Sequence, residues 1–195
     1  MKKKLIFCLC IALSIITFFA TLPISAYTYD CTVEVTSSAA LVVNVDTGTV
    51  VYDKNSNASR YSSYLSNIMT FVVVRNNVTK LDDKITIKKS VLDKVKNSDN
   101  SLKKFTGMTL TVNDLLHYLL LTDGTDAAFV LADYVSKGKI EDFVSLMNKK
   151  AVSLGCTKTK FSSPGVMFDT SQVTTCADMY KIVKAALDIP EYKEI

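Results

Sequence analysis

The chain has 195 residues, of which 23 are Lys or Arg, 19 are Asp or Glu and one is His. Three of the lysines lie in the first 26 residues, so the remainder is close to neutral, with 20 basic against 19 acidic residues. Nucleic acid is therefore excluded as a partner, because phosphate binding needs a concentrated basic face. The single histidine, His117, argues against His-based triads and multi-histidine metal sites, and we expect neither a metal nor a cofactor. His117 is predicted to be an ordinary helix residue.

Residues 1–26 have the pattern of a secretory signal peptide. Lys2 to Lys4 precede an apolar core from Leu5 to Leu22, and a small residue, Ala26, stands at the expected cleavage point. The alternative is a retained membrane anchor, since the apolar run approaches the length that spans a bilayer. Both interpretations predict an exported protein, secreted or held in the cell envelope. Any membrane contact would then be through this segment, and residues 27–195 suffice for one domain with its own core.

The five cysteines do not form a recognisable framework. Cys8 and Cys10 lie in the signal segment, which leaves Cys31, Cys156 and Cys176 in the mature chain. An odd number without close pairs matches neither a disulfide scaffold nor a zinc site. The sequence leaves the state of these three thiols open.

Two apolar runs, Ala40 to Val45 and Thr49 to Tyr52, flank the tripeptide Asp46-Thr47-Gly48. Their β-branched residues and the intervening glycine predict a β-hairpin. Asp-Thr-Gly after a strand also occurs in aspartic proteases, but those enzymes need two such aspartates that share a proton. No second Asp-Thr-Gly exists in the chain, so the turn is the better explanation. A further short strand is predicted around Ile85-Thr86-Ile87.

The rest of the chain is predicted to be mainly helical. Val91 to Lys104 is charged and is expected to be exposed. The hairpin is expected to pack beside the first helix, with the later helices clustered on one side. Apolar spacing and capping residues predict five helices. The first runs from Ser66 to Arg75, the second starts at Thr111, with Asp114 three residues on, and continues through a buried Leu115–Leu121, and the third starts at Asp126. The fourth runs from Ile140 to Leu154 and is ended by Gly155, and the fifth runs from Thr175 to Leu187 and is stopped by Pro190.

The start of the first helix, residues 62–74, is the first place to look for chemistry. Serines 62, 63 and 66 lead into an apolar run, and their hydroxyls are expected to cap the helix. A helix start directs backbone N–H groups and a partial positive charge at whatever reacts there, so it suits an anchored nucleophile.

Seven short pieces of sequence, in this order and spacing, resemble the D-alanyl-D-alanine carboxypeptidases. These are the low-molecular-mass penicillin-binding proteins that trim peptidoglycan stem peptides. The pieces cover most of residues 27–195. They are Val45-Asp46-Thr47-Gly48 with Val51-Tyr52, Ile68-Met69-Thr70, Thr111-Val112-Asn113-Asp114-Leu115-Leu116, Asp126-Ala127-Ala128 with Leu131-Ala132, Phe143 with Met147-Asn148 and Ala151, Leu154-Gly155 with Thr159 and Phe161, and Pro164-Gly165.

The resemblance implies an α/β (α+β) fold of the β-lactamase and transpeptidase type, an antiparallel sheet with a large helical part. It also implies a serine peptidase in which Ser-x-x-Lys supplies nucleophile and base, Ser-x-Asn aids proton transfer, and a Lys-Thr-Gly strand holds the substrate carboxylate. Residues 27–195 would be the N-terminal portion of such a domain, with the C-terminal strands of the sheet missing.

The positions that carry this chemistry are all altered. Alignment on Ile68-Met69-Thr70 puts Tyr64 at the nucleophile and Asn67 at the base. Alignment on Asp126-Ala127-Ala128 puts Asp123-Gly124-Thr125 in place of Ser-x-Asn, and no Lys-Thr-Gly occurs in the chain. Two other Ser-x-x-Lys matches, Ser101 to Lys104 and Ser136 to Lys139, are as many as chance predicts.

Four hypotheses follow. The chain is a family member that no longer catalyses, a binding module for peptidoglycan stem peptides or an envelope protein, or a fragment whose sheet a second polypeptide completes. A fully active hydrolase ranks last, because both nucleophile and base are replaced. In the fragment hypothesis, the sheet should expose a long apolar edge.

Overall fold

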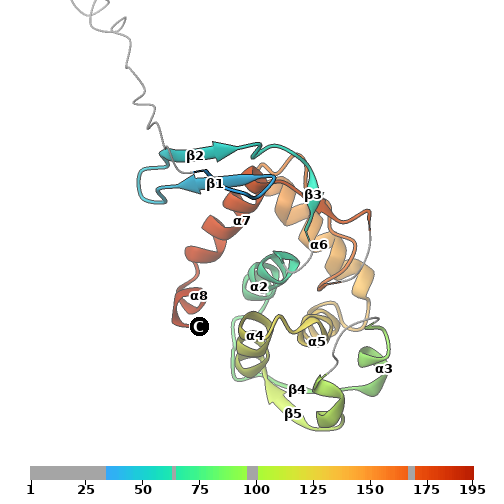
Figure 1. Ribbon diagram of the computed structural model, residues 1–195. Helices are drawn as coiled ribbons and strands as arrows, with labels where there is room; N and C mark the ends of the chain where they lie inside the picture. Colours follow the sequence, from blue (N-terminus) through green and yellow to red (C-terminus); the bar gives the residue numbers. More distant parts are fainter. Residues whose placement is uncertain (1–33, 63–64, 96–100, 167–169) are drawn as a thin grey trace, which may run out of the picture. The chain divides into compact units, whose positions relative to one another are not determined.

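The computed structural model describes residues 34–62, 65–95, 101–166 and 170–195 (Figure 1). The predicted signal segment, Cys31 and Tyr64 lie outside these ranges. The described residues fall within one unit that runs from Val33 to Ile195. In the ranges that are described, no helix is long and apolar enough to cross a bilayer.

The predicted hairpin is confirmed. Strands β1 (Ala40–Val43) and β2 (Val50–Lys54) pair antiparallel, with an irregularity in the register next to Val43. Asn44 closes the turn, because its Oδ1 accepts the backbone N–H groups of Asp46 and Thr47, both at 3.0 Å. Gly48 has a φ of 70° and donates its N–H to the Asn44 carbonyl at 2.8 Å. Asp46 therefore belongs to a turn.

The other strands among the described residues form two further antiparallel pairs. β3 (Arg60–Tyr61) pairs antiparallel with β6 (Val173–Thr174), and β4 (Lys84–Thr86) pairs antiparallel with β5 (Thr109–Thr111). The prediction around Ile85 is thus confirmed, whereas β3, β5 and β6 were not predicted, because strands of two or three residues are too short to show an alternating pattern. The predicted fold class, antiparallel strands with a large helical part, is confirmed.

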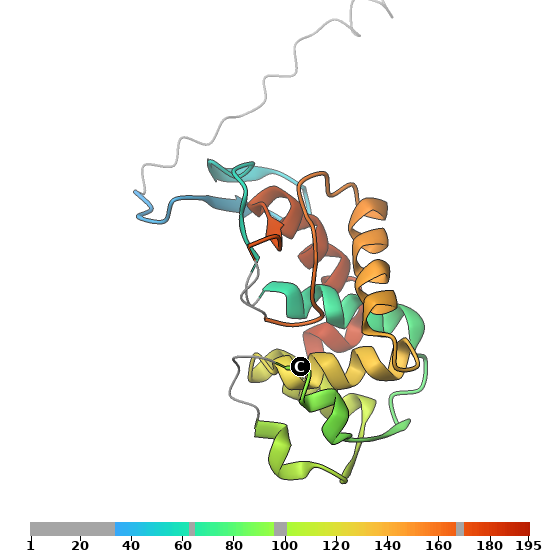
Figure 2. The ribbon, with the colours of Figure 1, turned by 90° about the vertical axis from the view of Figure 1, so that its right-hand side faces the viewer.

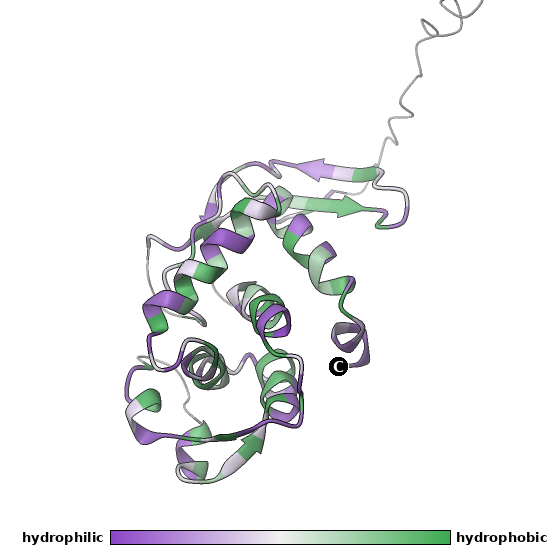
Figure 3. Ribbon diagram, turned by 180° about the vertical axis from the view of Figure 1, so that it is seen from behind, coloured by the Kyte–Doolittle hydropathy of each residue, from purple (hydrophilic) through white to green (hydrophobic). Residues whose placement is uncertain are grey.

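Helix α2 (Ser66–Asn77) is the centre around which the other long helices pack (Figures 1 and 2). Because it is covered on nearly every side, its middle is a continuous apolar run and not an amphipathic stripe. Figure 3 shows that hydrophobic residues are also concentrated on α4, α5 and β1. The helices that contact α2 are α4 (Val112–Leu121), α5 (Thr125–Val135), α6 (Ile140–Ser153) and α7 (Cys176–Leu187).

The expectation that serine hydroxyls cap α2 is wrong for Ser62, whose Oγ has no hydrogen-bond partner among the described residues, while Ser63 lies outside those residues. The residue before the helix is Leu65, which already has helical dihedral angles (φ −66°, ψ −16°), and its side chain makes no capping hydrogen bond. A capping residue needs an extended backbone to place its side chain over the first amides. The Leu65 N–H donates to the Ser62 carbonyl at 2.9 Å.

The predicted cap of α4 is present. The Thr111 Oγ1 accepts the Asp114 backbone N–H at 3.0 Å, and the Asp114 carboxylate accepts the Thr111 N–H at 2.9 Å. The hydroxyl of Thr111 also donates to that carboxylate, which lowers the pKa of Asp114. His117 lies on this helix, with Nδ1 3.0 Å from the Asn113 carbonyl oxygen, as an ordinary helix residue.

The substitution Thr111→Ala is expected to lower the free energy of unfolding by about 1 kcal/mol, the usual value of a threonine N-cap. Because the pKa of Asp114 is lowered in the folded state, its contribution is present at neutral pH and is lost as the pH falls below about 4. Urea unfolding of the wild-type and variant proteins at pH 7 and pH 3 should therefore show a smaller difference in acid. An equal difference at both pH values would contradict the reciprocal cap.

The prediction that Val91 to Lys104 is exposed is wrong for its apolar members. Val91, Leu92 and Leu102 are at most 3% exposed, and they lie on or beside α3 (Lys89–Leu92) and the 3₁₀ helix η2 (Ser101–Phe105). The charged residues between them gave the segment a polar composition, but its apolar side chains pack towards α5. The buried Asp126 carboxylate of α5 anchors η2 by accepting the Leu102 N–H at 2.8 Å, and burial raises the pKa of Asp126.

The helices predicted after residue 125 are confirmed, with one addition. Phe143, Met147 and Ala151 form the buried face of α6, and Gly155 ends it at a φ of 75°. Pro190, predicted only to stop α7, is instead the first residue of a further helix, α8 (Pro190–Glu194). A proline fits the first helical position, where its missing N–H would have no partner in the helix.

The placement of the hairpin differs from the prediction. Strand β1 makes its main helix contacts with α7, and α7 in turn packs against α2. The helices do lie on one side of the hairpin, below it in both Figure 1 and Figure 2. The sequence could not show this arrangement, because α7 is distant in the chain and has the same kind of apolar face as the other helices.

Candidate functional site

A cavity of about 390 Å³ lies where the start of α2, the end of α4 and α8 come together. Its volume is within the range of small-molecule sites. Its walls are mainly apolar and contain two of the four residues predicted as site positions, Asn67 and Asp123. The lining residues are Leu65, Asn67, Ile68, Leu119, Leu120, Leu121, Asp123, Tyr192 and Ile195.

Asn67 is the second residue of α2 and is only 2% exposed. Among the described residues, neither its Oδ1 nor its Nδ2 has a hydrogen-bond partner. An unpaired buried polar group costs about 1–3 kcal/mol of stability. A buried carboxamide that lines a cavity and has both atoms free is therefore a costly feature, and one that a bound molecule could satisfy.

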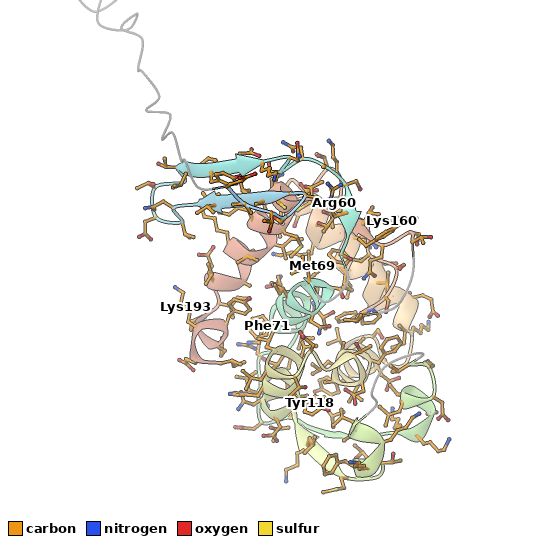
Figure 4. The ribbon with its side chains drawn as sticks, in the orientation of Figure 1. Arg60, Met69, Phe71, Tyr118, Lys160 and Lys193 are labelled. Atoms are coloured by element: carbon orange, nitrogen blue, oxygen red, sulfur yellow. The ribbon has the colours of Figure 1, made fainter. Side chains whose placement is uncertain are left out.

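Asp123 enters the same cavity from the corner between α4 and α5, where its φ is 52°. The next residue, Gly124, precedes α5, and a Cβ atom added to it would lie 2.5 Å from Cδ1 of Tyr118. Tyr118, labelled on α4 in Figure 4, thus packs directly on the backbone of this corner. The close contact holds the exposed Asp123 carboxylate at the cavity.

Thr125, the fourth predicted position, does not line the cavity. It is 4% exposed at the first turn of α5, and its Oγ1 accepts the Val166 N–H at 3.2 Å. A Cβ atom on Gly165 would lie 2.9 Å from Cγ2 of Thr125, so the two residues are in close contact. The structure therefore brings Asn67 and Asp123 together and directs Thr125 towards the segment around Gly165, while Tyr64 lies outside the described residues.

Two cavity residues come from the end of the chain: Tyr192 lies on α8, which sequence reasoning missed, and Ile195 follows it directly. Their spacing of three residues after a proline at a helix start was the signal that could have revealed them. The Glu191 carboxylate of α8 pairs with Arg75 at 2.6 Å, and the rings of Tyr192 and Phe71 lie 5.2 Å apart. Burial raises the pKa of Tyr192, so its phenol is a neutral part of the wall.

The pieces of sequence that carried the family resemblance mostly hold the fold together. The Thr70 hydroxyl donates to the Pro164 carbonyl, which ties α2 to the segment that contacts Thr125. The Asn148 side chain pairs with both backbone groups of Phe161, at 2.8 and 2.9 Å. These contacts do not depend on a nucleophile or a base, so the fold can persist without them.

Solved structures that match this arrangement of helices include penicillin-binding proteins and transpeptidases. A Streptomyces DD-transpeptidase matches with a TM-score of 0.73 and 31% identity, over 80% of this chain and 63% of that one. The D-alanyl-D-alanine carboxypeptidase DacD from Francisella tularensis matches with a TM-score of 0.76 and 25% identity, over 90% of this chain and 42% of that one. The described residues thus have the penicillin-binding protein and transpeptidase fold.

Residues 26–195 match the family model of the D-alanyl-D-alanine carboxypeptidases, and the chain belongs to this family. It is 31% identical over 158 residues to the D-alanyl-D-alanine carboxypeptidase DacF of Bacillus subtilis, a match that covers 77% of this chain and 39% of that protein. A Streptomyces D-alanyl-D-alanine carboxypeptidase is 31% identical over 160 residues, a match that covers 78% of this chain and 55% of that protein. The chain therefore spans about half the length, or less, of these curated relatives.

Proposed function

We propose that this chain is a non-catalytic member of the carboxypeptidase family, a binding module of the cell envelope that takes peptidoglycan stem peptides into the cavity at the start of α2. The observation that carries the proposal is Asn67. It stands where the family resemblance implies a lysine base, and a carboxamide cannot take a proton from a nucleophile. The exported location follows from the predicted signal segment, and the ligand class follows from the family.

A second candidate function is that of a fragment whose sheet is completed by a strand from a second polypeptide, and the exposed hairpin favours it. Val42 and Val50 are 52% and 50% exposed, and β1 pairs only with β2 among the described residues. An apolar, half-paired ribbon can accept a strand from another polypeptide. Size-exclusion chromatography of the purified chain separates the candidates, since a stable, soluble monomer supports the binding module, and association or aggregation supports a partner that completes the sheet.

The purified protein is expected to form no covalent adduct with a fluorescent penicillin, because acylation needs an activated hydroxyl and Asn67 cannot activate one. Labelling is measured on a denaturing gel beside an active carboxypeptidase of the family as a positive control. A labelled band that disappears in Ser66→Ala, Ser63→Ala or Tyr64→Phe would identify a working nucleophile and refute the proposal.

The substitution Asn67→Leu is expected to raise the free energy of unfolding by about 1–3 kcal/mol, because it removes two buried polar atoms that have no partner among the described residues. Urea unfolding measures the change. The matched control is Asn148→Leu, in which a well-bonded amide is lost and stability should fall. A loss of stability in Asn67→Leu would show that this amide is satisfied in the folded protein and is not retained for a ligand.

A further inference from the structure

We propose that the cavity selects a peptide with a neutral carboxamide and discriminates against one with a free carboxylate. The inference rests on the proposed function, since it names the ligand chemistry of the same site. It is drawn from the hydrogen-bonding groups, the charge and the shape of the residues that line the cavity.

The hydrogen-bonding groups come from Asn67. Its Oδ1 can only accept and its Nδ2 can only donate, and both are buried in the cavity wall without a partner among the described residues. A primary carboxamide presents an N–H and a carbonyl oxygen on the same edge, so one such group can pair with both atoms, whereas the N–H and C=O of a trans peptide bond point in opposite directions. A carboxylate presents acceptors only and would leave the Asn67 Oδ1 unpaired, which carries the full cost of an unmade buried hydrogen bond.

The charge comes from Asp123. It has the one carboxylate side chain among the described residues that line the cavity, and none of those lining residues is basic. The start of α2 supplies a partial positive charge of about one half, which is less than the full negative charge of a carboxylate. The balance therefore opposes a second anion and accepts a neutral group, because like charges in a partly apolar cleft repel more strongly than in water.

The shape comes from the apolar walls. Ile68 of α2, Leu119 and Leu120 of α4, and Tyr192 of α8 surround the polar groups. These side chains favour a ligand with small apolar groups beside its amide, since burial of apolar surface is the main source of affinity in such pockets. A short alanine-containing peptide that ends in a carboxamide meets all three requirements.

The test compares two probes that differ only at one end, diacetyl-lysyl-D-alanyl-D-alanine as the free acid and as the C-terminal carboxamide. Affinity is measured by isothermal titration and by NMR chemical-shift changes at pH 7, and D-alanine release from the acid is followed in the same samples. The wild-type protein is expected to bind the carboxamide at least tenfold more tightly than the acid. Asp123→Asn should lower the ratio severalfold by improving binding of the acid, because only the discrimination that comes from Asn67 then remains. Asn67→Leu should weaken binding of the carboxamide.

The control variant is Asp82→Asn, which removes one exposed acid outside the cavity and should leave the ratio unchanged. Equal or tighter binding of the acid by the wild-type protein, or an unchanged ratio in Asp123→Asn, would overturn this inference and leave the proposed function intact. Binding of neither probe at millimolar concentration would overturn both. Release of D-alanine would overturn the proposed function, while the affinity ratio would still decide the inference.

Discussion

A variant that carries both Tyr64→Ser and Asn67→Lys is expected to release no D-alanine above background from a D-alanyl-D-alanine peptide. The two changes rebuild the nucleophile and base that the family resemblance implies, and such a pair acts as a unit whose members are strongly non-additive. The rest of the machinery would still be absent. Asp123 keeps a carboxylate at the cavity, Thr125 remains bonded to the Val166 backbone, and no Lys-Thr-Gly occurs in the 195 residues.

The size of the expected deficit follows from positioning. Correct placement of a substrate next to a nucleophile is worth several orders of magnitude in rate, so two restored side chains without a group to hold the substrate carboxylate should give no measurable turnover. The assay follows free D-alanine over hours, with an active carboxypeptidase of the family in parallel and the single variants as controls. Turnover well above the single variants would show that substrate positioning is already present, and our explanation of why the chain would not catalyse would be wrong.

The substitution Phe71→Ala is expected to lower the free energy of unfolding by about 3–5 kcal/mol, the usual cost of removing a fully buried phenylalanine. Phe71, labelled on α2 in Figure 4, is completely buried. Its ring contacts that of Tyr192 of α8. The change should therefore also loosen the wall of the cavity that Tyr192 and Ile195 form. Urea unfolding measures the stability, and the NMR signals of residues 190–195 report the position of α8.

Phe105→Ala is the matched control, because Phe105 is 41% exposed on η2 and does not line the cavity. Its cost should stay below about 1 kcal/mol. A large loss of stability in Phe71→Ala without any change in the signals of α8 would contradict the role of the Phe71–Tyr192 contact. Equal losses in the two variants would contradict the central position of α2 in the core.

Several features of this protein could be predicted from the sequence because they depend on residues close together in the chain. The hairpin follows from the two apolar runs around Asp46-Thr47-Gly48, the start of α4 from the Thr111 and Asp114 pair, and the buried face of α6 from its apolar spacing. The order of such local features was also enough to indicate the family. Local sequence patterns do not record contacts between distant segments, which explains why Val91 to Lys104 was predicted wrongly. Its composition is polar, whereas its apolar residues contact α5, which lies more than twenty residues away in the chain.

Other features were decided only by the tertiary structure. Sequence alignment treated Asn67, Asp123 and Thr125 as equivalent site positions, but only the packing of α2, α4 and α5 shows that two of them line one cavity and the third does not. Helix α8 completes that cavity from the far end of the chain, held by its contacts to Arg75 and Phe71. A cavity is the space left between elements after they pack, so its members and its charge depend on long-range contacts that no local pattern of residues records.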